Sequence, residues 1–183
     1  MINESVQEAY MRPELPELRH ELLRRAQCDQ EARHGLGDQP APEQWTRVRA
    51  VDADNTSWLE RVVADHGWPG YRLVDADGAH SAWLLAQHAP LDFQQRCLPL
   101  LRHAVEEGDA SEVELAYLDD RVRTREQRPQ RHGTQWIIDD TKHRLLPLDD
   151  PDGVNERRNA LGLPLLDEAD ITRALPHDSA TDR

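Results

Sequence analysis

Apolar residues spaced three and four positions apart are the feature that most constrains how this chain can fold. From Pro13 onward such a spacing places one set on a single helix face: Leu15, Leu18, Leu22 and Ala26. Residues 79–88 are apolar on nearly all sides, which is typical of a helix inside a bundle. The sequence therefore predicts a mainly α fold, a single-domain bundle of about five to seven helices.

One segment has a different pattern of apolar and polar residues. Residues 134–138 and 143–148 are separated by four polar residues, a pattern that predicts a short β-hairpin near the C-terminal third. Residues 1–12 show no period and are expected to be flexible, and the polar residues 176–183 are expected to form a disordered tail. The helical domain is thus predicted to cover residues 13–175.

Capping residues indicate where several helices begin and end. Gly67 is expected to end one helix, and Trp68-Pro69-Gly70 to form the turn after it. A second turn is expected at residues 75–78. The candidates for N-caps are Asp52, Asp54 or Asn55 for the helix before Gly67, Asp92 with Gln95 for a later one, and Ser111 with Glu114 for the next.

The net charge of −13 argues against a nucleic-acid partner or an anionic membrane, because binding phosphates requires a basic face. No apolar run approaches the roughly 20 residues that cross a bilayer, and the N-terminus lacks the order of a signal peptide. We therefore expect a cytoplasmic protein. Cys28 and Cys97 match no metal or redox spacing and are expected to be reduced thiols.

Two histidines carry the first chemical hypothesis. His66 and His88 each end a predicted helix, where a protonated imidazole can simply stabilise the helix terminus. If they face one another, they can serve as a general acid and a general base. No cofactor or metal is predicted; the alternative is a metal site of two His and one carboxylate, completed by Asp120 or Asp29.

Charged residues also interrupt apolar helix faces. Asp29 and Arg33 continue the stripe of the first helix, and Asp120 lies at the apolar boundary of a later helix, next to Arg121. A structural salt bridge of Asp120 with Arg33 or Arg121 is one interpretation. In the other, Asp120 orients a His or acts as a base, while Arg121 holds an anionic substrate group.

The segment before the hairpin contains His132-Gly133-Thr134-Gln135. A glycine there allows the backbone to approach a ligand or partner closely, although a plain turn is equally compatible. Thr134 and Gln135 can supply neutral donors and acceptors for recognition or for stabilising developing charge.

Taken together, a series of motifs resembles an uncharacterised bacterial family catalogued as domain of unknown function 6624. The motifs occur in order over about residues 15–170: Asp29-Gln30 with Arg33, Asp54-Asn55, His66 to Pro69, Ala82 to Ala89, Ala116 to Leu118 with Asp120-Arg121, Gln130 with Gly133 to Gln135, and Asp150 to Leu163. The resemblance implies no known activity. It adds Gln87 and Gln130 to the candidate residues and favours one shared polar pocket. His132 ranks lower, because the family usually has Tyr at that position.

These observations lead to two hypotheses of different classes. The first is an enzyme that converts a small molecule or a group on a peptide by His/Asp acid–base chemistry. Its candidate catalytic residues are His66, His88 and Asp120, and its candidate substrate-binding residues are Asp29, Arg33, Gln87, Arg121, Gln130, Thr134 and Gln135. The second is a non-catalytic binding module with a structural charge network and a basic protein partner.

Overall fold

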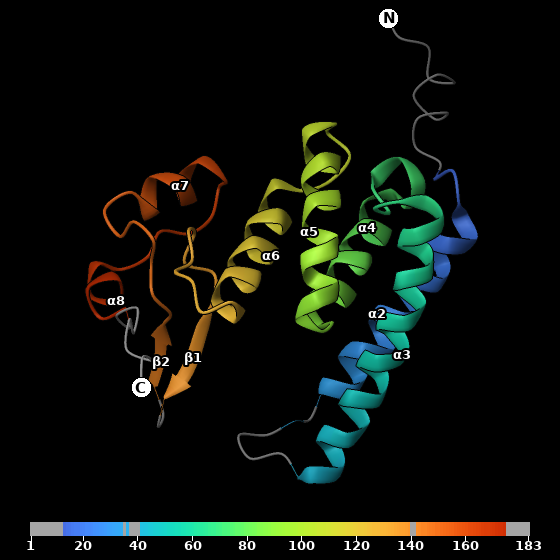
Figure 1. Cartoon of the computed structure of the whole chain (residues 1–183), viewed down its shortest axis with the longest axis horizontal. Coiled ribbons are helices and arrows are strands. Elements are labelled where there is room, and N and C mark those ends of the chain that lie inside the picture. Colours follow the sequence, from blue (N-terminus) through green and yellow to red (C-terminus); the bar gives the residue numbers. More distant parts are fainter. Residues whose placement is uncertain (1–12, 35, 37–40, 140–141, 175–183) are drawn as a thin grey trace, which may run out of the picture. The chain divides into compact units, whose positions relative to one another are not determined.

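A computed structural model describes residues 13–34, 36, 41–139 and 142–174 of the chain (Figure 1). The described residues form seven helices and one two-stranded antiparallel hairpin, which confirms the predicted fold class. The chain divides into two compact units, Met1–Ala110 and Ser111–Arg183, and each is described here by itself. The predicted single domain at 13–175 stays a prediction, and both predicted loose ends, 1–12 and 176–183, lie outside the described residues.

Four helices form the first unit: α2 (Pro16–Arg33), α3 (Pro42–His66), α4 (Tyr71–His88) and α5 (Leu91–Glu106). Helix α2 packs against both α3 and α4, and α4 packs against α5 (Figure 1). The apolar faces of these helices supply the buried core of the unit: Leu22, Leu59, Val74, Leu85, Phe93, Cys97 and Leu101. Burial of these faces is the main source of stability for helices of this length.

The start of α3 differs from the prediction. The helix begins at Pro42, so Asp52, Asp54 and Asn55 lie within it, and the prediction that one of them is an N-cap was wrong. Proline suits the first turn because its missing N–H would have no helical partner there. The prediction that this helix ends before Gly67 is confirmed, with Gly67 at a φ of 75°.

Two further boundaries were predicted only in part. Helix α5 begins at Leu91 without a side-chain cap, so the predicted cap at Asp92 was wrong; the extended backbone of Pro90 already sets the start. The turn expected at residues 75–78 is a break at one residue, Asp75, whose φ of 63° interrupts α4. As predicted, α4 ends at His88.

The second unit contains α6 (Glu112–Arg125), β1 (Trp136–Asp139), β2 (Lys142–Leu145), α7 (Val154–Ala160) and α8 (Glu168–Thr172). The predicted cap of α6 is confirmed, because the Ser111 hydroxyl accepts the Glu114 N–H at 3.3 Å. In the hairpin Trp136 pairs with Leu145, and both strands are shorter than predicted. Among the described residues of both units, no helix has the length and apolarity to cross a membrane.

Candidate acid–base site

Asp29 is a buried carboxylate on α2. Its residue exposure is 0%, although it continues a stripe of apolar positions. Arg33, one turn further along the same helix, donates from Nη1 to Oδ1 of Asp29 at 2.7 Å, and Gln30 donates from Nε2 to Oδ2 at 3.0 Å. These hydrogen bonds compensate for the loss of hydration of a buried charge.

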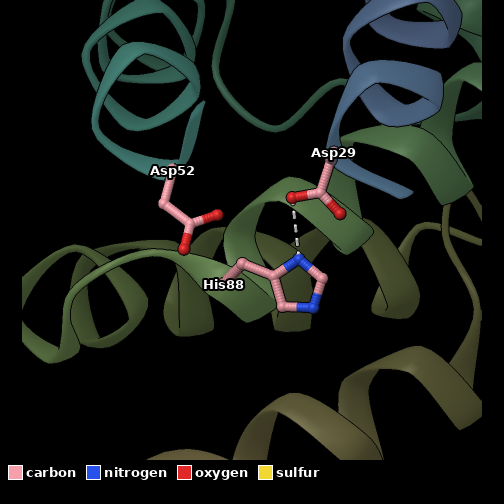
Figure 2. A group of neighbouring side chains, drawn as sticks. All are labelled: Asp29, Asp52 and His88. Carbon is pink, nitrogen blue, oxygen red and sulfur yellow. Dashed lines mark hydrogen bonds and ion pairs between the residues drawn. The ribbon is translucent and has the colours of Figure 1, made fainter. Parts of the chain in front are cut away.

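His88, the last residue of α4, reaches the same carboxylate. Its Nδ1 lies 3.0 Å from Oδ1 of Asp29, as Figure 2 shows. The side chain of His88 is 21% exposed, whereas that of Asp29 is 1% exposed. An ionised carboxylate only accepts hydrogen bonds, so the proton of a neutral His88 ring lies on Nδ1 and the lone pair on Nε2.

Asp52 joins this cluster from α3. Arg33 donates from Nη2 to Oδ1 of Asp52 at 2.7 Å and therefore bridges two carboxylates from two helices. Asp52 was not predicted as a site residue, because α3 was expected to start only after Asp52, Asp54 or Asn55 instead of at Pro42. With α3 starting at Pro42, Asp52 and Asn55 fall one turn apart on the side of α3 that contacts α2.

The cluster also has the composition of a metal site. Asp29, Asp52 and His88 each offer one ligand atom, and these atoms lie within 4.8 Å of one another. The set has one His and two carboxylates, rather than the two His and one carboxylate of the alternative considered from the sequence. Arg33 already places a positive charge on both carboxylates.

His66 lies elsewhere in the first unit. It is exposed at the end of α3 and lines a hollow of about 430 Å³ together with Trp68, Arg72 and His103, among others. Neither His88 nor Asp29 belongs to the lining of this hollow. The structure thus does not bring the two histidines to one hollow, and a catalytic role for His66 stays a prediction.

Gln87, which precedes His88 on α4, is 4% exposed. Neither its amide nitrogen nor its amide oxygen has a hydrogen-bond partner among the described residues. A buried amide without a partner is unfavourable, and such a group commonly indicates a bound water or ligand. The predicted substrate-binding role of Gln87 is untested but compatible with this arrangement.

In the second unit, Asp120 is a buried carboxylate of another kind. Its exposure is 0%, and it accepts the backbone N–H groups of Arg131 at 2.6 Å, of His132 at 3.0 Å and of Thr134 at 3.2 Å. The Thr134 hydroxyl donates to it at 3.0 Å, and Nδ1 of His132 lies 3.6 Å away. Burial raises the pKa of Asp120, but the interactions with His132 and these N–H groups outweigh it, and the pKa lies below its ordinary value.

The other predicted residues of this unit also bind its own backbone. The Gln130 side chain donates to the carbonyls of Gln135 and Leu146 at 2.9 and 3.0 Å and accepts the N–H of Gln135 at 2.8 Å. Gly133 has a φ of 66°, and a Cβ there would lie 2.6 Å from the Leu166 side chain. The close approach expected at this glycine is therefore to the protein's own chain.

The predicted residues thus fall into two sets. Asp29, Arg33 and His88 meet in the first unit, and Asp120, Gln130, Thr134 and Gln135 interact in the second, where Arg121 follows Asp120 on α6. Each set belongs to its own compact unit. The shared pocket drawn from both sets stays a prediction.

Comparison with known proteins gives one finding. No curated protein and no solved structure matches the chain. The profile of a family of unknown function (DUF6624) matches residues 16–177, a span that contains every candidate residue named above. The chain belongs to this family of unknown function.

Proposed function

We propose that the protein is an enzyme that uses His88 as a general acid–base group on a small molecule or on a group of a peptide. In this proposal Asp29 orients the His88 ring, and Arg33, itself held by Asp52, keeps the Asp29 carboxylate in place. Proton transfer by a positioned histidine is the most common form of acid–base catalysis, and it contributes roughly 10²–10⁴-fold to a rate.

One observation carries the proposal: a partly exposed imidazole is hydrogen-bonded through Nδ1 to a fully buried carboxylate, at 3.0 Å. The carboxylate stabilises the imidazolium that forms when Nε2 takes a proton, and it fixes the orientation of the ring. Among the described residues, Asp29 is the only hydrogen-bond partner of the His88 side chain, so Nε2 is left for a substrate.

Arg33 favours a substrate with an anionic or amide-bearing group. Its side chain is 22% exposed and lines a hollow of about 350 Å³, together with Gln27, Gln30, Glu31 and His34. The planar guanidinium can bind a carboxylate or a phosphate through two N–H groups while its other contacts hold it in place.

The orientation of the His88 ring can be tested without a substrate. A free histidine side chain prefers the proton on Nε2, so we expect ¹⁵N spectra of the neutral ring to show the proton of His88 on Nδ1 instead. In Asp29→Asn this preference should weaken, because the amide can also donate to the ring. A wild-type His88 ring with the proton on Nε2 contradicts the proposal.

A search for activity tests the proposal directly. The purified protein is incubated with a panel of small esters, amides and phosphorylated metabolites, and the products are followed by mass spectrometry. Any conversion should fall by roughly 10²–10⁴-fold in His88→Gln. The matched control is His20→Gln, because His20 is exposed on α2 outside the cluster. A conversion that persists unchanged in His88→Gln excludes the proposed role.

A metal-dependent enzyme is the second candidate, because Asp29, Asp52 and His88 place three ligand atoms within 4.8 Å. A bound divalent cation would replace Arg33 on both carboxylates and could activate a water molecule. Elemental analysis of protein purified without a tag tests this candidate. Stoichiometric zinc or manganese that is lost in Asp52→Asn supports it, and a metal-free, fully active preparation removes it.

A further inference from the structure

A third hollow lies between α2 and α3, and its lining contains none of the residues of the proposed acid–base site. Its volume is about 330 Å³, and α2 contributes Arg24, Arg25 and Cys28 to its wall. From α3 come the remaining residues of the lining: Arg47, Ala50, Val51, Asp54 and Asn55. A space of this size accommodates a small molecule or one charged end of a larger one.

The lining is cationic in a protein that is strongly acidic overall. It contains three arginines and one aspartate, in a chain of net charge −13. Glu21, next to the hollow, pairs with Arg24 at 2.6 Å and with Arg25 at 2.8 Å. Arg47 is exposed and forms no ion pair or hydrogen bond with any described residue, so it contributes an unpaired positive charge.

Arg25 is held in a fixed position at this hollow. Its guanidinium lies 4.6 Å from the centre of the Trp58 ring, and its Nη1 donates to Asp54 at 2.7 Å and to Oδ1 of Asn55 at 3.0 Å. The side chain of Arg25 is only 11% exposed. A guanidinium that is already ordered loses little conformational entropy when it binds an anion.

An unpartnered donor in the wall points independently to a ligand. Asn55 is 4% exposed, and its Nδ2 is buried without a hydrogen-bond partner among the described residues. The bond from Arg25 to Oδ1 fixes which end of the amide is the acceptor, so the unpartnered atom is a donor. A buried N–H without an acceptor is unfavourable unless a bound molecule supplies one.

We propose that this hollow is a binding site for a small anion with several oxygens, such as a phosphate or carboxylate group. Arg47 provides the unpaired positive charge, Arg25 provides an ordered guanidinium, and the Asn55 amide donates to one oxygen of the ligand. This site does not depend on the proposed activity of His88, because neither His88 nor Asp29 lines the hollow.

Calorimetric titration with inorganic phosphate and with citrate, at constant ionic strength, tests the proposal. We expect saturable one-to-one binding of at least one of these probes, and the stronger of the two identifies the anion class. Arg47→Gln should weaken it by about tenfold, as loss of one charge-assisted contact predicts. The matched control is Arg61→Gln, which removes an exposed arginine of α3 that does not line the hollow and should leave affinity unchanged.

Asn55→Asp is the sharper variant. The new carboxylate keeps an oxygen for Arg25, so the fold should persist, but it places a negative charge where the anion is expected and should abolish binding. Circular dichroism of the variant checks that it is folded. No binding of either probe by the wild type overturns the proposal, and so does equal binding by folded Asn55→Asp.

Cys28 gives a local readout of the same site. It is partly exposed in the wall of the hollow, whereas Cys97 is fully buried and burial raises its pKa to about 12. The neutral reagent iodoacetamide should therefore modify Cys28 first. Phosphate or citrate should slow this reaction in the wild type and in Arg61→Gln, but not in Asn55→Asp. Equal protection in all three proteins reports adventitious anion effects only and overturns the proposal.

Discussion

Asp29 in the first unit and Asp120 in the second are both fully buried, but different kinds of group donate hydrogen bonds to their carboxylates. Asp120 accepts hydrogen bonds mainly from backbone N–H groups of residues 131–134 and from one hydroxyl, and Nδ1 of His132 lies further away, at 3.6 Å. Asp29 accepts hydrogen bonds from side chains, among them the guanidinium of Arg33 and the imidazole of His88. Both of these side chains are about one fifth exposed. The same residue type on an apolar helix face thus has two different environments.

The difference separates structural from chemical use of a carboxylate. Backbone N–H groups cannot take up or release a proton in the working range of pH, so most bonds of Asp120 fix the loop before the hairpin. A histidine can take up or release a proton in this range, and a carboxylate bonded to one ring nitrogen raises the basicity of the other. His132 lies 3.6 Å from Asp120, beyond hydrogen-bond distance, whereas His88 lies 3.0 Å from Asp29. Asp29 is therefore the better candidate for a chemical role, and Asp120 is better explained as a residue that positions the loop.

The largest expected loss of stability is that of the variant Asp120→Ala. Asp120→Ala leaves three backbone N–H groups without their acceptor inside the second unit, and we expect a loss of about 3–5 kcal/mol in its free energy of unfolding. Hydrogen exchange of the amides of Arg131, His132 and Thr134 measures the change locally, together with chemical denaturation. Glu156→Gln on α7, an exposed residue, is the control. If the three amides stay protected in Asp120→Ala, the structural interpretation is wrong.

Asp29→Ala should have a smaller effect on stability, about 2 kcal/mol. Arg33 keeps its bond to Asp52, and both Arg33 and His88 can reach water, so no charged group is left fully buried. Thermal and chemical denaturation measure the effect. A loss as large as that of Asp120→Ala would remove the contrast and favour the alternative of a non-catalytic module with a structural charge network.

Much of the fold could be predicted because its signals are local. The periodicity of α2, the glycine after α3, the cap of α6 at Ser111 and the hairpin all depend on residues close in sequence. The wrong helix starts have a common cause. Asp52 and Asp92 are good caps by residue type, but the chain uses prolines at both starts and leaves these aspartates to other contacts.

The site was harder to predict, because its contacts join residues far apart in the sequence. The apolar stripe indicated Asp29 and Arg33 as candidates, and the helix end indicated His88. That His88 binds Asp29 across 59 positions is decided by how α2 packs on α4, which no local pattern encodes. Asp52 was missed because α3 was expected to start after it and because its partner Arg33 lies on another helix.

Acid should remove the stabilising contribution of Asp120. The pKa of Asp120 is lower in the folded protein than its ordinary value, so its stabilising contribution is complete above about pH 4, the value for an unfolded chain, and is lost as pH falls through the folded pKa. The measurement is the unfolding free energy of wild type and Asp120→Asn between pH 6 and about pH 2. Glu21, Asp77 and Asp150 also have lowered pKa values and titrate in both proteins, so they cancel in the difference. The difference in unfolding free energy between the two proteins should become smaller as the pH falls. A constant difference contradicts a lowered pKa of Asp120.

Thr134 offers the smallest and most specific test. Its hydroxyl donates to Oδ2 of Asp120 at 3.0 Å and accepts from Nε2 of Gln135 at 3.0 Å. Thr134→Val keeps the shape and the backbone N–H but removes this one donor, so we expect a loss of about 1 kcal/mol. In Asp120→Ala the same substitution should cost less, because the acceptor is already gone, and a double-mutant cycle measures the difference. Additive effects would mean that Thr134 stabilises the loop through Gln135 rather than through the carboxylate.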